Sequence, residues 1–122
     1  MENALPPRQL TKREAAIIRW LLSRTFDGVE ALRVQVACAR VAQQWGPNDP
    51  SIDLVVDEDV VAADLADGPT PGVAWAYDAS GEPIATVLLW IEGGYLSALE
   101  IGTVTDDQTS ELPPAISLRW GR

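Results

Sequence analysis

A pair of adjacent glycines between two β-prone runs is the feature of this sequence that most constrains its fold. Residues 84–104 read IATVLLWIEGGYLSALEIGTV, with Gly93 and Gly94 at the centre. Two glycines in this setting favour a two-residue β-turn, because both turn positions need a positive φ angle. A two-residue turn also fixes the register, and it places Glu92 opposite Tyr95. The sequence therefore predicts a long β-hairpin.

This register decides which residues share a face of the hairpin. Counted outward from the turn, it places Trp90 opposite Ser97 and Val87 opposite Glu100. Both faces are then largely apolar, whereas a strand with one face in water alternates more regularly. We therefore expect the hairpin near the middle of a sheet, covered on at least part of both faces.

Glu100 is the exception among the apolar residues of the hairpin. A buried carboxylate is costly unless it is paired or hydrogen-bonded. One interpretation is structural, in which Glu100 lies at the sheet margin or pairs with an arginine. The other interpretation is functional, in which Glu100 is a recognition or acid/base carboxylate.

Aromatic residues form a second group of candidates. Trp90 and Tyr95 share one face in the predicted register, and Trp75 and Tyr77 are expected to extend it on the neighbouring strand. A cluster of this kind usually belongs to the core, because large rings bury much apolar area. The alternative is a platform for a ligand or a partner.

The residues before the hairpin predict two helices. Thr11 and Glu14 form a capping box that begins a helix over residues 12–24. Apolar residues at helical spacing then indicate a second helix over residues 28–36. Strands are expected near residues 38–45, 51–57 and 73–77 and in the hairpin, and residues 115–120 form either a last strand or a tail.

Helices followed by a run of strands are typical of an α+β fold. We expect the two N-terminal helices to pack on one face of a mostly antiparallel sheet of about four to five strands. The chain of 122 residues is long enough for a single domain with its own core. Residues 1–10 are expected to form an extended lead-in, and residues 106–122 a loop and a C-terminal tail. The exposed part of the other sheet face is then the natural binding surface.

The composition excludes several kinds of chemistry. The chain has no histidine and a single cysteine, Cys38, so it has no Ser-His-Asp or Cys-His catalytic group and no Cys/His zinc site. Glycine-rich phosphate loops are also absent. We therefore predict a protein that is not an enzyme and has no cofactor and no metal.

Charge is unevenly distributed along the chain. Residues 1–40 hold seven Lys and Arg against four Asp and Glu, a net charge of +3, whereas residues 41–122 have a net charge of −12. An acidic body argues against binding of nucleic acid and favours a basic protein partner. Asp57, Glu58 and Asp59 form the densest acidic run, which is either a solvated strand end or part of a binding surface.

Neither the composition nor the N-terminal sequence indicates a membrane protein. No apolar run approaches the roughly 18 residues that a spanning helix needs. Residues 1–14 lack the charged and apolar pattern of a signal peptide. We therefore expect a cytoplasmic protein that does not bind membranes.

Four short motifs resemble a family of small uncharacterised proteins from actinobacteria and related bacteria. The motifs are Leu10-Thr11 with Glu14, FDGVEALR with Gln35, PSIDL, and GYLSALEI. Members of that family often carry a cysteine-rich turn before the Pro-Ser motif, whereas residues 45–49 here contain no cysteine. The family has no function to transfer, although some relatives resemble immunity or accessory proteins. The resemblance singles out Glu100, Ser51 and Asp53 as residues with a shared role.

Three functional hypotheses follow. The first is a non-enzymatic protein-binding module, of which an immunity-type inhibitor of a basic partner is one form. The second is a self-associating accessory protein, such as a homodimer that buries one face of the hairpin. The third is a small-molecule-binding protein or enzyme that uses Glu100 with Tyr95 or Tyr77.

Overall fold

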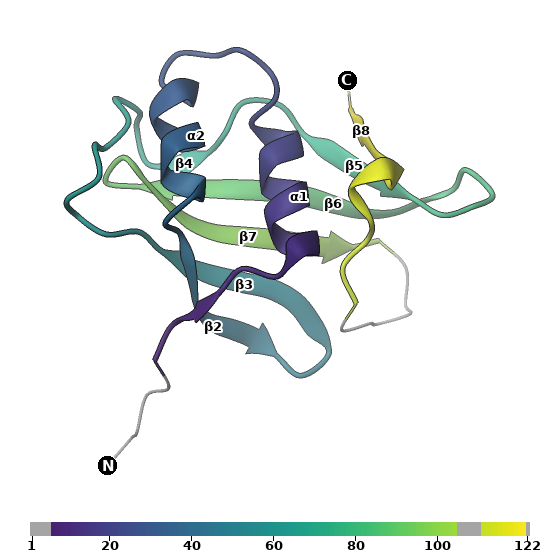
Figure 1. Cartoon of the computed structure of the whole chain (residues 1–122). Coiled ribbons are helices and arrows are strands. Elements are labelled where there is room, and N and C mark those ends of the chain that lie inside the picture. Colours follow the sequence, from purple (N-terminus) through teal and green to yellow (C-terminus); the bar gives the residue numbers. More distant parts are fainter. Residues whose placement is uncertain (1–5, 105–110, 122) are drawn as a thin grey trace.

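In a computed structural model, which describes residues 6–104 and 111–121, two α-helices lie on one face of an eight-stranded antiparallel sheet (Figure 1). The α+β class is confirmed, but the sheet has more strands than expected. The additional strands are two or three residues long, and strands of that length leave no alternation for sequence patterns to detect. The helices are α1 (Lys12–Leu21) and α2 (Val29–Val36).

The order of the strands places the predicted hairpin near the middle of the sheet. Strands are arranged as β1-β2-β3-β7-β6-β5-β8, and β4 pairs with β6 beside this path. The bounds are β1 Arg8–Gln9, β2 Arg40–Gly46, β3 Asp49–Val55, β4 Gly68–Pro69, β5 Ala74–Tyr77, β6 Pro83–Glu92, β7 Tyr95–Thr103 and β8 Leu118–Trp120.

Helix α1 begins at the predicted capping box. The Thr11 hydroxyl accepts from the Glu14 N–H, and the Glu14 carboxylate accepts from the Thr11 N–H at 2.8 Å. Glu14 also accepts two hydrogen bonds of 2.9 Å from the Arg8 guanidinium, which fastens β1 to the helix. Burial raises the pKa of Glu14, but the bonds from Arg8 and Thr11 outweigh burial and leave this pKa below its ordinary value.

The helix ends three residues earlier than predicted, at Leu21. Arg33 of α2 donates from Nε to the Leu22 carbonyl at 2.8 Å, and from a second nitrogen to the Arg24 carbonyl at 3.3 Å. These bonds satisfy carbonyl groups that follow the helix, which otherwise lack partners. A contact from α2 therefore stabilises the end of α1, and local sequence does not reveal it.

The turn of the central hairpin is confirmed, and its register is wrong by one residue beyond the tip. Gly93 and Gly94 both have positive φ angles, of 61° and 85°. Glu92 pairs with Tyr95 as expected, but a β-bulge follows, and Trp90 pairs with Ala98 instead of Ser97. From there on every pair is shifted, so Glu100 faces Leu88 rather than Val87.

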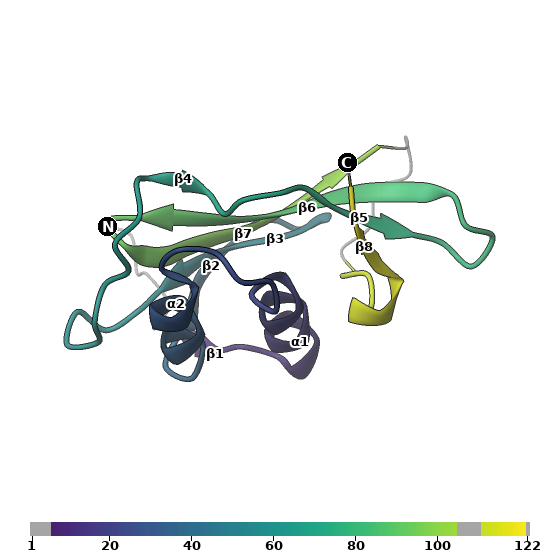
Figure 2. The same cartoon turned by 90° about the horizontal axis from the view of Figure 1, so that it is seen from above.

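Both helices cover the same face of the sheet, and the core lies between the two layers (Figure 2). Ile17 and Leu32 of the helices are fully buried, as are Leu99 and Ile52 of the central strands to within 1%. No helix among the described residues covers the other face (Figure 2). The hairpin was expected to be covered on part of both faces, but a helix layer covers only one face, and the side chains on the other face are mostly half-buried.

The two ends of the described chain join opposite edges of the sheet. Residues 115–120 were expected to form either a last strand or a tail, and the structure shows a strand. Strand β8 pairs with β5 and follows a short 3₁₀ turn at Ala115–Ser117. Trp120 of β8 stacks on Trp20 of α1 with ring centroids 4.8 Å apart, and the Arg24 guanidinium lies 4.4 Å from the Trp120 ring centre. These ring contacts hold the C-terminal strand against the helix layer.

The acidic connection between β3 and β5 contains no helix. It is fixed instead by Gln35, a fully buried residue of α2. The Gln35 amide nitrogen donates to the Val61 carbonyl at 3.1 Å and to the Gly94 carbonyl at 2.9 Å. The Gln35 oxygen accepts from the Leu96 N–H at 2.9 Å. One side chain thus joins a helix, the connection and the hairpin tip.

Candidate binding face

The sheet face opposite the helices carries the residues that could recognise a partner. Side chains alternate between the two faces along each strand. Because Ile52, Leu89 and Leu99 form a buried row under the helices, their neighbours Asp53, Trp90 and Ala98 form a row on the other side. We call this surface the open face, and its side chains include Trp45, Asp53, Trp75, Tyr77, Leu88, Trp90 and Glu100.

Glu100 is half-buried on the open face and is held by a tryptophan. The indole nitrogen of Trp90 donates to Oε1 of Glu100 at 2.9 Å. The β-bulge makes this bond possible, because it places Glu100 and Trp90 diagonally across β6 and β7 on the same face. Neither structural alternative for Glu100 holds, since the residue lies on a central strand and its recorded partner is an indole rather than an arginine.

A second indole–carboxylate pair lies on the neighbouring strands. The indole nitrogen of Trp45 on β2 donates to Oδ1 of Asp53 on β3 at 2.9 Å. Trp45 is 44% exposed, which is a large exposure for an aromatic ring. Each pair uses one carboxylate oxygen internally and leaves the second without a recorded hydrogen bond in the described part of the chain. The open face therefore presents two oriented carboxylates beside two aromatic rings.

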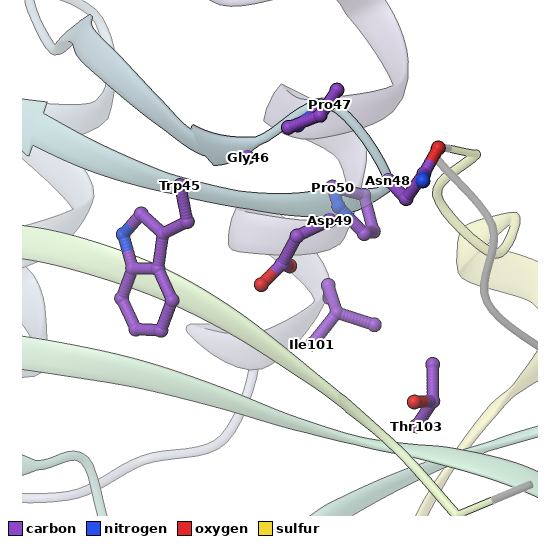
Figure 3. Close-up of a pocket in the computed structure, with 8 residues that line it drawn as sticks. All are labelled: Trp45, Gly46, Pro47, Asn48, Asp49, Pro50, Ile101 and Thr103. Atoms are coloured by element: carbon purple, nitrogen blue, oxygen red, sulfur yellow. The ribbon is translucent and has the colours of Figure 1, made fainter. Parts of the chain in front are cut away.

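A hollow of about 390 Å³ lies beside this face at the β2–β3 turn (Figure 3). Strands β3 and β7 pair only at Ile52–Leu99 and Asp53–Ala98. Beyond these pairs the buried Ser51 hydroxyl accepts from the Ile101 N–H at 2.8 Å and takes the place of a ladder bond. The hollow lies where the strands separate, and it is lined by Trp45, Gly46, Pro47, Asn48, Asp49, Pro50, Ile101 and Thr103.

The structure brings together only some of the residues predicted for a site. Trp75 and Tyr77 are half-buried on the open face, and Trp75 pairs with Thr86 of β6. Tyr95 is used internally, because its hydroxyl donates to the carbonyls of Val60 at 2.9 Å and Glu58 at 3.1 Å. Tyr95 therefore anchors the connection after β3 rather than extending the Trp90 cluster.

The acidic run at residues 57–59 does not reach into this cluster of rings and carboxylates. Asp57, Glu58 and Asp59 are all exposed at the turn that follows β3. The Asp57 carboxylate accepts from the Asp59 N–H at 3.0 Å, which closes the turn locally. This arrangement agrees with a solvated strand end.

Sequence reasoning missed Trp45 and Asp49. Both residues fall within residues 45–49, the segment without cysteine, and neither was among the residues predicted for a binding site. The position of Trp45 two residues after Gln43 in a strand that alternates between its two sides was the available signal for Trp45. The hollow itself could not be foreseen, because it depends on where β3 separates from β7.

The helix layer holds more basic than acidic side chains. Among the described residues, it carries Lys12, Arg13, Arg19, Arg24 and Arg33, together with Glu14, Asp27 and Glu30. The centre of the open face carries Asp53 and Glu100, whereas basic residues occur at its two ends. Arg40 pairs with Val55 on β3, and Arg119 pairs with Trp75 and donates to the carbonyls of Ile116 and Leu118.

Neither helix within the described ranges has the length and hydrophobicity that crossing a bilayer requires. The described residues also contain no group of three or more acidic or thiol side chains arranged to hold a metal ion. Comparison of the chain with family models, curated proteins and solved structures gives no match. The resemblance to small actinobacterial proteins therefore stays a prediction, and the function must be argued from the open face.

Proposed function

We propose that the protein is a non-enzymatic binding module whose open face docks on a basic protein, in the manner of an immunity-type inhibitor. The two indole–carboxylate pairs, Trp45–Asp53 and Trp90–Glu100, carry this proposal. Tryptophan is enriched among residues that dominate binding energy in protein interfaces. A carboxylate that is already held in place loses little freedom when a cationic group binds to it.

The chemistry of the face favours recognition over catalysis. Asp53 pairs with Ala98, and Glu100 follows two residues along β7, so the two carboxylates are diagonal neighbours on the open face. Both accept an indole N–H, which orients each carboxylate for a second hydrogen bond from a cationic group. The centre of the face is acidic, so a nucleic-acid phosphate chain would be repelled there.

Self-association is the second candidate, and exposed apolar residues favour it. Ile116 is 85% exposed, Val61 74% and Val34 64%. These residues come from the 3₁₀ turn, the β3–β5 connection and α2, so they are distributed over different elements. Light scattering at micromolar protein concentration tests this candidate. A monomeric mass at that concentration would contradict self-association.

An enzyme built on Glu100 is the third candidate, and an isosteric change separates it from the others. In Glu100→Gln the amide oxygen still accepts the Trp90 N–H, so the fold should persist. Loss of small-ligand binding with retained folding would support a chemical role for the carboxylate. Unfolding of this variant would instead assign Glu100 a structural role.

Dependence on ionic strength tests the proposed function. Tagged protein is used to capture partners from a lysate of the source organism at low and at high salt, and bound proteins are identified by mass spectrometry. A basic protein held at low salt and released at high salt is the expected result, because contacts between exposed charges weaken with screening. Capture that is insensitive to salt would contradict the role assigned to the carboxylates.

A further inference from the structure

The hollow at the β2–β3 turn has the walls of a site for one flat cationic group. The Trp45 ring forms one side of it, and the Asp49 carboxylate extends into the space between Trp45 and Ile101 (Figure 3). Its volume of about 390 Å³ lies at the small end of the range for ligand pockets. Among the described residues that line the hollow, Asp49 is the one with a charge, so the hollow has a negative charge beside an aromatic face.

Hydrogen bonds hold both of these side chains in position before anything binds. The bond from the Trp45 indole nitrogen to Asp53 fixes the ring against β3. Oδ1 of Asp49 accepts from the Ser51 N–H at 2.9 Å, so the carboxylate is oriented and its second oxygen has no recorded bond in the described chain. The Gln44 amide bridges the carbonyls of Gly46 and Asp49 and stiffens the turn. A site arranged in advance loses less entropy on binding.

We propose that this hollow binds the guanidinium group of an arginine side chain on the protein partner, with its plane stacked on Trp45 and an N–H donated to Asp49. This proposal rests on the proposed function and deepens it, since it names the residue type that the partner inserts. A guanidinium fits better than an ammonium, because it is planar, weakly hydrated and able to stack on a ring while donating at its edge.

The test uses small probes, so it does not need the partner to be known. Nα-acetyl-arginine amide is titrated into ¹⁵N-labelled protein, and the indole N–H signals of the five tryptophans are followed by NMR. The matched probes are the citrulline amide, which is a neutral isostere, and the lysine amide. The expected result is a saturable shift at Trp45 with arginine, binding by lysine that is about tenfold weaker, and no saturation with citrulline.

Two variants locate the contact. Asp49→Asn keeps an oxygen that accepts the Ser51 N–H but loses the charge, so arginine affinity should fall about tenfold. Asp27→Asn, which removes an exposed charge at the start of α2, should leave this affinity unchanged. Equal shifts with arginine and citrulline would overturn the proposal, as would full affinity in a folded Asp49→Asn variant.

The outcomes also separate this proposal from the proposed function. If a basic partner is captured in a salt-sensitive way but arginine amide does not shift Trp45, the arginine site is refuted and the binding module stands. If arginine amide binds at Trp45 but no basic partner is captured, the arginine site stands and the docking role is refuted.

Discussion

The arrangement of the hairpin tip should depend more on Gln35 than on any other polar side chain of the described residues. In Gln35→Met the length of the side chain is kept and its three hydrogen bonds are lost. The buried Leu96 N–H then has no acceptor, whereas the Gly94 carbonyl keeps a bond of 2.8 Å from the Ala63 N–H, and Val61 lies at the surface. One orphaned donor and the net loss of the other bonds should together lower the free energy of unfolding by about 2–4 kcal/mol.

Gln35→Glu tests the same geometry through its dependence on pH. The second carboxylate oxygen would face the carbonyls of Gly94 and Val61, so the folded state should raise the pKa of this carboxyl above its unfolded value. A raised pKa means that the folded state binds more protons, so stability is greatest at low pH and is lost as pH rises through the folded pKa.

Urea denaturation of both variants between pH 4.5 and 8 measures these effects, and hydrogen exchange at the Leu96 amide reports the site itself. The difference in free energy of unfolding between wild type and Gln35→Met should be constant with pH. The difference between wild type and Gln35→Glu should grow as pH rises. If the free energy of unfolding of Gln35→Met were within about 0.5 kcal/mol of the wild-type value, the reasoning would be refuted, because a change that small is typical of surface substitutions.

Three further perturbations test other parts of the structure. Gly94→Ala should lower the free energy of unfolding by more than about 2 kcal/mol, because φ is +85° and a Cβ would lie 2.5 Å from the Ala63 carbonyl oxygen. Gly93→Ala has open space around its Cβ and should lower it by about 1 kcal/mol. Equal losses for the two variants in thermal or urea unfolding would contradict the close contact at Gly94. Glu14→Gln should lower the free energy of unfolding by about 1–2 kcal/mol at neutral pH. Because the folded pKa of Glu14 is lowered, this difference should persist above the unfolded pKa and narrow as pH falls through the folded pKa; a difference independent of pH would contradict the ion pair with Arg8. Trp120→Ala should cost about 3 kcal/mol in urea unfolding through loss of the Trp20 and Arg24 contacts, and an effect below about 1 kcal/mol would show that β8 is not held there.

The parts of the fold that could be predicted depend on neighbours in sequence. The capping box at Thr11 and Glu14 and the turn at Gly93 and Gly94 are local, and both form as expected. The bulge after the turn is not local, because the Leu96 amide beside it bonds to Gln35, which lies 61 residues earlier. A missed bulge moves every later residue to the other face, which is why Glu100 was assigned to the wrong neighbours.

The candidate site shows the same limit. Trp90 and Glu100 were both named from sequence, but the bond between them appears only in the shifted register. Trp75 and Tyr77 lie on the same face as Trp90 because β5 pairs directly with β6. Trp45 and Asp53 lie on two strands that were both predicted, yet their bond requires the irregular pairing of β2 with β3.

Whether the open face is the docking surface is the central claim, and one comparison of variants tests it most directly. Partner capture is measured for wild type, for Asp53→Asn with Glu100→Gln, and for Asp27→Asn with Glu30→Gln. The first pair removes two charges from the open face and keeps both acceptors for the indoles, whereas the second removes two exposed charges at the start of α2. The account predicts that the open-face variant loses at least about tenfold in affinity for the basic partner and that the helix variant stays within about twofold. Equal losses in the two variants, or a loss only in the helix variant, would contradict it.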